Sequence, residues 1–318
     1  MDVFVNNDTV SEIDQMDLTK MKNLIKKTSE VAWDNDITSA KLEEWLANFS
    51  GEALGNETVE KKLAAWMLLN FVFYTLDDVR SYCKSLYEEY IHYKLLVYMK
   101  TNTLQDKSID EQILHILENT VFVALGNDSE SGSNILYFFR QENGLAKKYF
   151  EITNKCYENV VFVDDVTLSG SQATGYINQL KMSSSNTFFL TFISTRTAEK
   201  SINDIGIKVI SANILTEREK CFSDFSYVFN NENKKTFLNL AKRMSEHYGK
   251  KILNNHVDLK DHPLGFADGQ QLFGFYYNTP DNSLPIFWCN LDGWVPAFRR
   301  YDKLYNREAM KYDESIFI

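Results

Sequence analysis

Two adjacent acids and a short Ser/Gly bend form the stretch of this chain that is best suited to chemistry. Asp164 and Asp165 directly follow the apolar run 160–163, and the bend 169–171 then opens a predicted helix. In an open α/β sheet, ligands lie just beyond the carboxyl ends of the strands, where N–H groups of the next turn converge. Carboxylates accept hydrogen bonds from the vicinal hydroxyls of a ribose, and such a bend holds a phosphate. The pattern predicts a sugar-phosphate site; the alternative is that the acids end a buried strand and cap a helix.

This stretch resembles the binding loop of type I phosphoribosyltransferases, in which an apolar strand precedes two acids, an apolar residue, two variable positions and Thr/Ser-Gly. The resemblance implies that Asp164 and Asp165 hold the ribose hydroxyls of PRPP or a nucleotide and are the catalytic pair. A bound Mg²⁺ on the same two acids would offset their repulsion of a polyanionic ligand. Gln172 departs from the family pattern, which has Thr or Ser there, so Ser171 is expected to supply that hydroxyl. The implied phosphate loop consists of Thr167, Leu168, Ser169, Gly170 and Ser171.

A second loop precedes this motif by one strand. The run 121–125 predicts a buried strand, and the polar loop 126–133 follows it. In the resembled family the first sheet loop binds pyrophosphate, which implies ligand contacts from Ser131, Gly132 and Ser133. The alternative is an ordinary solvated turn, since Ser/Gly loops are common at surfaces.

Four basic residues are candidates for contact with a phosphate. Arg140 closes the helix after the first loop, and Arg196 follows the predicted strand 186–194. Both are taken as substrate-binding candidates because guanidinium groups make bidentate contacts with phosphate; for each, the alternative is a solvated charge at a helix end. Lys147 and Lys148 lie where the resembled family often has a mobile hood that excludes water, and their alternative is surface charge.

Composition sets the class of protein. The chain has 318 residues, 44% hydrophobic and 14% aromatic, with four prolines, which is typical of a globular protein. Its net charge is −10, and residues 1–117 hold 12 basic and 20 acidic residues, a net of −8. An acidic first third is a poor surface for nucleic acid, which needs clustered Lys and Arg. The phosphate chemistry is therefore expected in the second part of the chain.

The start of the chain, its apolar runs and its cysteines predict a cytoplasmic protein that does not span a membrane. The first residues lack the basic start and apolar core of a signal peptide. The longest apolar run, 63–76, is too short to span a bilayer. The four cysteines lie far apart with no Cys-x-x-Cys pair, which predicts reduced and mostly buried thiols.

Other catalytic patterns are not supported. The sequence has no Gly-x-Ser-x-Gly motif, Cys/His pairing or zinc pattern. His256 and His262 lie six apart in a loop, where a turn is favoured over a metal site. A basic stretch near the end is interleaved with aromatic residues and could contact RNA or DNA, although an amphipathic end segment is favoured. Its members are Arg299, Arg300, Lys303, Arg307 and Lys311.

The periodicity of apolar residues indicates how these candidates are positioned. Helical stripes come first; strands then alternate with helices, which predicts a parallel sheet with right-handed crossovers. An amphipathic helix over 236–248 is expected to end at Gly249. Before the alternation, helices are predicted over 37–49, 58–73, 75–99 and 108–117. Strands are predicted over 121–125, 160–163, 186–194 and 207–215.

The expected fold is thus α/β, with a phosphoribosyltransferase-like parallel sheet flanked by helices. An N-terminal all-helical region covers 1–117, and the phosphoribosyltransferase-like domain covers 118–318. Within the latter, residues 251–318 form a loop-rich C-terminal extension, which is expected to shape the base side of the site. Loops of this length often hold specificity elements.

The extension and three further segments together resemble a branch of phosphoribosyltransferase-like proteins from bacterial conflict systems. The matching segments are Trp45-Leu-Ala-Asn-Phe49, Leu68-Leu-Asn-Phe71, Ser131-Gly132 and the tail from His262-Pro-Leu-Gly265 to Leu284-Pro-Ile-Phe-Trp288. The resemblance implies an effector, or toxin, of an antiphage defence system such as a retron. Its partners would then be a reverse transcriptase with a non-coding RNA/DNA complex, or other defence proteins.

Two other functions remain open from the sequence, because a fold does not fix a function. One is a non-catalytic module that senses a nucleotide or docks a partner protein through the acidic helices. The other is a metabolic phosphoribosyltransferase.

Overall fold

The computed structural model describes residues 15–126, 131–153, 156–180, 184–229, 232–291 and 293–300. Internal contacts divide the chain into two compact units. Residues 1–75 and 217–318 form one, called here the helical unit, and residues 76–216 form the other, called the sheet unit. Within the ranges described, no helix combines the length and apolar character needed to cross a bilayer.

The sheet unit alternates strands and helices after two initial helices. The first of its capped helices begins at Ser108, whose side chain accepts a hydrogen bond from Glu111 N–H, while Glu111 accepts one from Ser108 N–H. Its elements are α5 (Leu76–Thr101), α6 (Ile109–Glu118), β2 (Thr120–Ala124), α7 (Ser131–Glu142), the 3-10 helix η1 (Lys147–Phe150), β3 (Tyr157–Thr167), α8 (Ser171–Leu180), β4 (Ser184–Thr195), α9 (Arg196–Asn203) and β5 (Lys208–Leu215).

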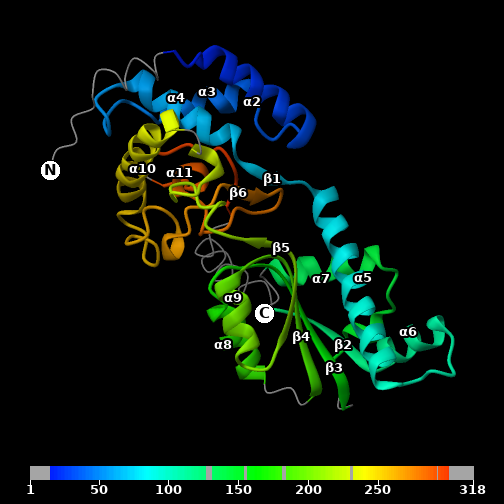
Figure 1. Ribbon diagram of the computed structural model, residues 1–318. Coiled ribbons are helices and arrows are strands. Elements are labelled where there is room, and N and C mark those ends of the chain that lie inside the picture. Colours follow the sequence, from blue (N-terminus) through cyan, green and yellow to red (C-terminus); the bar gives the residue numbers. More distant parts are fainter. Residues whose placement is uncertain are drawn as a thin grey trace, which may run out of the picture. The chain divides into compact units, whose positions relative to one another are not determined.

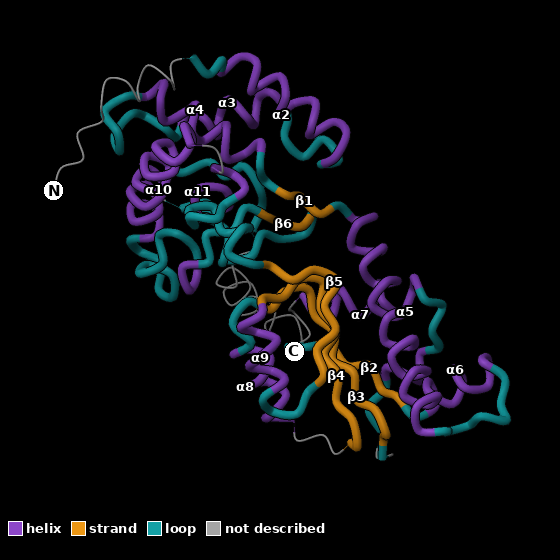
Figure 2. The backbone as a smooth tube through the Cα atoms, in the orientation of Figure 1, coloured by secondary structure: helices purple, strands orange, loops and turns teal. Residues whose placement is uncertain are grey.

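The four strands of this unit form one parallel sheet in the order β2-β3-β4-β5 (Figure 2). Phe162 at its centre pairs with Val123 on one side and Phe189 on the other. Parallel neighbours require a crossover between them, and the intervening helices α7, α8 and α9 supply it. The predicted α/β fold with a parallel sheet and flanking helices is confirmed.

Helices cover both faces of this sheet (Figure 1). On one face, Ala173 of α8 and Ile202 of α9 share a buried apolar cluster with Phe162 of β3. On the other face, the ring of Tyr90 on α5 lies edge-on to Phe122 of β2, with ring centres 5.9 Å apart. A parallel sheet needs this double cover because its strands are apolar on both faces.

The helices α5 and α6 belong to the sheet unit, so its boundary differs from the division expected at residue 117. Their buried faces pack on the sheet, as the contact between Tyr90 and Phe122 illustrates. The sheet unit accordingly begins at Leu76 and ends at Thr216, and the chain from Glu217 onward returns to the helical unit.

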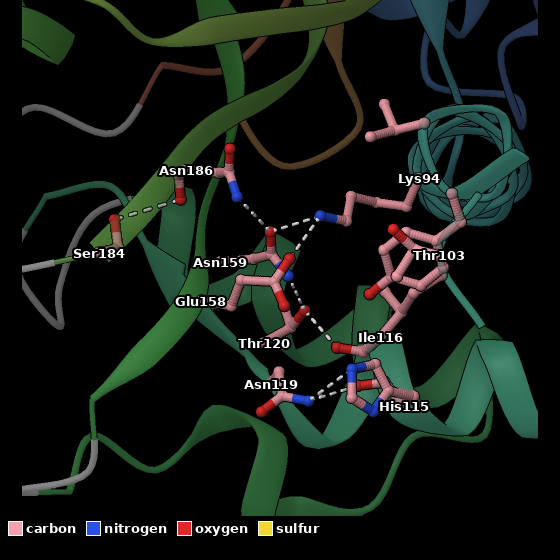
Figure 3. Close-up of polar contacts among 12 residues, drawn as sticks. Lys94, Thr103, His115, Ile116, Asn119, Thr120, Glu158, Asn159, Ser184 and Asn186 are labelled. Atoms are coloured by element: carbon pink, nitrogen blue, oxygen red, sulfur yellow. Dashed lines mark hydrogen bonds and ion pairs between the residues drawn. The ribbon is translucent and has the colours of Figure 1, made fainter. Parts of the chain in front are cut away.

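A buried polar network joins α5 to the amino-terminal ends of the strands, called here the amino edge of the sheet (Figure 3). The ammonium of Lys94, whose side chain is 4% exposed, donates to Glu158 Oε1 and Asn159 Oδ1, each at 2.9 Å. Asn186 of β4 also donates to Asn159 Oδ1, at 3.4 Å. Burial raises the pKa of the neighbouring Tyr98 to about 12, and the charge of Glu158 adds to this shift. The network thus links the beginnings of β3 and β4 to one helix.

The helical unit is built from segments far apart in the sequence. Trp45 stacks on Phe287 with ring centres 5.4 Å apart, and its indole N–H donates to Ile286 O at 2.9 Å. The predicted N-terminal helices are confirmed, and they pack as an aromatic core. The elements are α2 (Leu18–Ala32), α3 (Ser39–Ala47), α4 (Glu57–Leu69), β1 (Val72–Tyr74), η2 (Tyr227–Phe229), α10 (Glu232–Leu253), η3 (Phe266–Asp268), β6 (Phe273–Phe275) and α11 (Pro285–Trp288).

Two expected helix ends in this unit are wrong. The helix predicted over 58–73 ends at Leu69, and Phe73 lies on β1, which pairs in parallel with β6 and stacks Phe73 on Phe298. Helix α10 continues past Gly249 to Leu253. A Cβ at Gly249 would lie 2.1 Å from Pro263 O, so this glycine permits a close backbone approach and does not terminate the helix.

Replacement of the buried lysine tests the amino-edge network. Lys94→Met leaves Glu158 and Asn159 without their shared donor, so the free energy of unfolding should fall by about 2–3 kcal/mol. Urea unfolding followed by circular dichroism measures this. Lys84→Met on the exposed side of the same helix is the matched control, expected within about 0.5 kcal/mol of the unchanged protein. Equal effects of the two substitutions would contradict the network's role.

Thiol labelling tests the burial pattern of the whole chain. Cys156 is exposed, whereas Cys83, Cys221 and Cys289 are buried. Burial raises the pKa of Cys83 to about 12 and that of Cys221 well above its usual value, so neither forms thiolate at pH 8. Iodoacetamide should therefore modify one thiol in the folded protein and four after denaturation, as counted by mass spectrometry. Cys156→Ser should lose the fast reaction, and rapid labelling of a second thiol would argue against this fold.

Candidate functional site

The acid pair lies within the last part of β3, not after its end. β2 stops at Ala124, opposite Val163, whereas β3 continues beside β4 through Thr167. Asp164 pairs with Thr191 of β4. The strand was expected to end at Val163; it continues because β4 is long enough to pair with the two acids. Asp164 and Asp165 therefore lie at the carboxyl ends of the strands, called here the carboxyl rim of the sheet. Both lie past the last residue of β2, whereas β4 still runs beside them.

Hydrogen bonds from the backbone hold both acids. Asp165 N–H donates to Asp164 Oδ1 at 2.9 Å, and Val166 N–H donates to Asp165 Oδ1 at 2.8 Å. Thr191 Oγ1 donates to the carbonyl of Asp165 at 3.0 Å. The two acids are only 6% and 9% exposed. Adjacent buried carboxylates are costly unless hydrogen bonds or a positive charge compensate them, and these backbone donors supply part of that compensation.

The bend after β3 contains the hydroxyls predicted for a phosphate loop. Thr167 is the buried last residue of the strand, and Leu168 is half-buried. Ser169 and Ser171 are exposed; their hydroxyl oxygens lie 2.7 Å apart, and Ser171 N–H donates to Ser169 Oγ at 3.3 Å. Helix α8 begins at Ser171, so the N–H groups of its first turn lie at this bend. The acids, the bend and the helix start therefore follow one another in the predicted order, although the acids lie within the strand and not after it.

Gly170 is required in the bend for two reasons. Its φ of +76° lies in the left-handed region, which side chains with a Cβ rarely adopt. In addition, a Cβ at this position would lie 3.0 Å from Ala198 O and 3.1 Å from Ser201 Cβ of α9. The bend therefore approaches α9 more closely than any other residue type allows without displacement.

The first predicted loop can be described in part. Residues 127–130 and the side chain of Ser131 lie outside the described residues, although α7 begins at Ser131. Gly132 is buried, and a Cβ there would lie 2.3 Å from Leu125 O. Ser133 is half-buried. Gly132 thus lets the start of α7 pack on the end of β2 at the carboxyl rim, and contact of this loop with a ligand stays a prediction.

The two candidate arginines have different positions. Arg196 is the first residue of α9, directly after β4, and it pairs with Glu199 at 3.2 Å while remaining 76% exposed. It therefore lies at the same rim as the acids. Arg140 lies in the last turn of α7, eight residues after Gly132 and thus roughly 12 Å along the helix from the rim. The fold does not bring Arg140 to the acid pair.

The lysines expected in a hood lie at the amino-terminal ends of the strands, away from the acids. Lys147 and Lys148 belong to η1, which precedes β3, and they pair with Glu151 at 3.2 Å and Glu118 at 2.5 Å. Because Glu118 itself precedes β2, these lysines lie near the amino ends of the strands. They do not reach the rim where the acids stand.

Two residues at the rim escaped the sequence interpretation. Thr195 caps α9 by accepting from Ala198 N–H at 3.1 Å, and it donates to Leu168 O at 2.6 Å. Glu199, 15% exposed in its side chain, accepts from Ser194 Oγ at 3.1 Å as well as pairing with Arg196. A Thr between a strand and a helical pattern is an N-cap signal, so capping could be predicted for Thr195. Its bond to Leu168 could not, since the two residues are 27 apart.

Cation binding at the rim would need ligands beyond the side chains. Among the described residues there is no group of three or more His, Cys, Asp or Glu arranged to hold a metal. Mg²⁺ commonly takes one or two carboxylates and completes its shell with water and substrate phosphates. The donor set of Asp164 and Asp165 fits that mode. In the other candidate loop, His256 Nδ1 accepts from the N–H groups of Asp258 and Leu259, each at 3.2 Å, which is a turn.

A pocket of about 210 Å³ opens elsewhere on the sheet unit. Its wall includes Val160, Phe162 and Thr187 from the sheet and Ile177 from α8. None of the predicted site residues lines it, so it is not the site that the sequence indicates.

Comparison with known proteins assigns the chain to a family. A comparison with curated proteins gave no significant match. Four solved chains match, among them orotate phosphoribosyltransferase from Aeropyrum pernix, with 12% sequence identity and a TM-score of 0.25. That match covers 31% of this chain and spans 61% of the length of the archaeal enzyme. The PRTase-CE family model matches residues 42–300, most of both units. The chain belongs to the PRTase-CE family, the phosphoribosyltransferase-like proteins of conflict systems.

Proposed function

We propose that the carboxyl rim of the sheet unit binds the ribose 5-phosphate part of PRPP or of a nucleotide and breaks or forms its C1′ bond. The single observation that supports this most directly is the continuous order of buried acids, bend and helix start from Asp164 to Ser171. Family membership agrees with it, because the name of the family implies a phosphoribosyl ligand.

Each part of the rim has a distinct role in this proposal. Asp164 and Asp165 accept hydrogen bonds from the two ribose hydroxyls; such charge-assisted bonds are roughly twice as strong as neutral ones. The 5′-phosphate lies at the start of α8, where N–H groups and the helix dipole favour an anion. The hydroxyls of Ser169 and Ser171 add donors there, and Arg196 offers a bidentate contact to a further anionic group.

The chemistry follows from this placement. In a transfer from PRPP, the bond from C1′ to the pyrophosphate oxygen breaks, its electron pair leaves with pyrophosphate, and an acceptor supplies the new pair to C1′. The sugar passes through an oxocarbenium-like state, which the two carboxylates stabilise because they are held in place beforehand. Mg²⁺, when bound by Asp164 and Asp165, would neutralise charge on the phosphates.

At the level of the cell, we propose that the chain is the effector of a defence system that modifies or depletes a nucleotide or nucleic acid. The assignment to conflict systems supports this role. In a retron, the partner would be a reverse transcriptase with its non-coding RNA/DNA, which would keep the effector inactive until infection. A purine or pyrimidine operon around the gene would favour a metabolic phosphoribosyltransferase instead.

One observation favours a second candidate, a non-catalytic nucleotide sensor. Oδ1 of each acid already accepts a backbone hydrogen bond, and both side chains are nearly buried. A site of this kind binds ribose hydroxyls without turnover if no acceptor can reach C1′. Measurement of turnover and of binding in parallel separates the two functions.

Neutralisation of the acid pair tests the proposed site. Asp164→Asn/Asp165→Asn should weaken binding of PRPP with Mg²⁺ by roughly 10- to 100-fold, because two charged acceptors are lost at about 1.5–3 kcal/mol each, part of which solvent recovers. Isothermal titration gives the affinity, and product analysis with PRPP and nucleotides gives turnover. Asp110→Asn, an exposed acid of α6 in the same unit, is the control. Unchanged affinity in the double variant rules out this rim as the ligand site, whereas binding without turnover in the unchanged protein supports the sensor.

The defence role predicts that toxicity depends on the same acids. Expression of the chain without its neighbouring genes should arrest bacterial growth, and co-expression of those genes should relieve the arrest. The double variant Asp164→Asn/Asp165→Asn should be harmless at equal protein level. Colony counts after induction measure this outcome. Toxicity that persists in the double variant, with no turnover in either protein, would contradict an enzymatic effector.

A further inference from the structure

The junction of β4 and α9 is bonded to the predicted phosphate loop through the hydroxyl of Thr195. Thr195 Oγ1 donates to Leu168 O at 2.6 Å and accepts from Ala198 N–H at 3.1 Å. Leu168 precedes Ser169 in the bend, so the bond joins the loop after β3 to the first turn of α9. Because β3 and β4 are adjacent and parallel, their ends meet at this rim.

A second contact holds the same two segments together. Gly170 packs against Ala198, the residue that Thr195 caps, closely enough that a Cβ would lie 3.0 Å from Ala198 O. A shift of α9 relative to the bend would therefore disturb both the Leu168 bond and the Gly170 packing. Thr195 therefore caps α9 and, through its bond to Leu168 O, also anchors the bend.

We propose that Thr195 is a positioning residue for the phosphate loop, an inference that rests on the proposed function of that loop. Its one proton goes to Leu168 O, and its oxygen accepts from Ala198 N–H, so it acts through the loop and is not a phosphate ligand. Holding Leu168 fixes the direction of the N–H groups that follow it. Loops ordered before binding cost less free energy on association, so this anchor increases affinity for a phosphate monoester.

Substitutions at Thr195 separate this role from simple capping. Thr195→Val removes both hydrogen bonds, whereas Thr195→Ser keeps a hydroxyl that makes both. Ser108→Ala removes the cap of α6 in the same unit, away from the rim, and controls for the lost stability of a helix cap. Thermal unfolding reports stability, and titration with ribose 5-phosphate, and with PRPP and Mg²⁺, reports affinity.

The expected results are specific to the loop. Thr195→Val should bind ribose 5-phosphate roughly tenfold more weakly, Thr195→Ser within about twofold of the unchanged protein, and Ser108→Ala equally tightly despite its lower stability. Hydrogen exchange without ligand should show faster exchange of the N–H groups of 169–171 in Thr195→Val and not in Ser108→Ala. Because no ligand is added, this measurement depends neither on the ligand's identity nor on the variant staying folded during a titration.

The outcomes that overturn the inference differ from those that overturn the proposed function. If Thr195→Val is less stable but binds as tightly and exchanges as slowly at 169–171 as the unchanged protein, Thr195 is a helix cap alone. If the unchanged protein binds neither ribose 5-phosphate nor PRPP, the proposed function fails and the positioning role falls with it. Weak binding in both Thr195→Val and Thr195→Ser would also contradict the role of the hydroxyl.

Discussion

The rim of the sheet unit depends on a difference in strand length. β3 and β4 stay paired through Thr167 and Ser194, whereas β2 ends at Ala124. The extra residues of β3 therefore have a neighbour on one side only, and those residues include Asp164 and Asp165. Pairing with β4 fixes the backbone of both acids, while β2 ends at Ala124 and no other described strand pairs with that side of β3. If β2 were as long as β4, the acids would lie inside the sheet.

At the rim, two pairs of backbone segments approach each other closely, and a glycine permits each approach. Gly132 permits the start of α7 to pack on Leu125 O, and Gly170 permits the bend after β3 to pack on α9. A Cβ at Gly132 would overlap Leu125 O, and a Cβ at Gly170 would lie only 3.0 Å from Ala198 O. The hydroxyl of Thr195 adds a directional bond to the second of these contacts. Small residues and a hydroxyl therefore bring two loops to one edge of the sheet.

Strand β3 connects two polar regions of different character. At its amino end Glu158 and Asn159 are paired with the buried ammonium of Lys94, so their charge and polarity are compensated by the protein itself. At its carboxyl end the two acids accept hydrogen bonds from the backbone and form part of the proposed ligand site. The first arrangement stabilises the unit through a buried ion pair, whereas hydrogen bonds from neighbouring N–H groups hold the second in place.

Local pattern in the sequence was sufficient for the order of acids, bend and helix, the alternation of strands and helices, and the helix that begins near residue 108. These features depend on residues within one or two turns of each other. Local pattern was insufficient where segments far apart in the sequence come into contact. Phe73 joins a strand because β6 lies beside it, Gly249 lies inside α10 where it permits the close approach of Pro263, and Arg140 is separated from the acids by the length of α7. Thr195 meets Leu168 only because two parallel strands end at the same edge. The types of residue at the site follow from the sequence; which of them meet was decided by tertiary packing, since contacts between residues far apart in the chain leave no local periodicity.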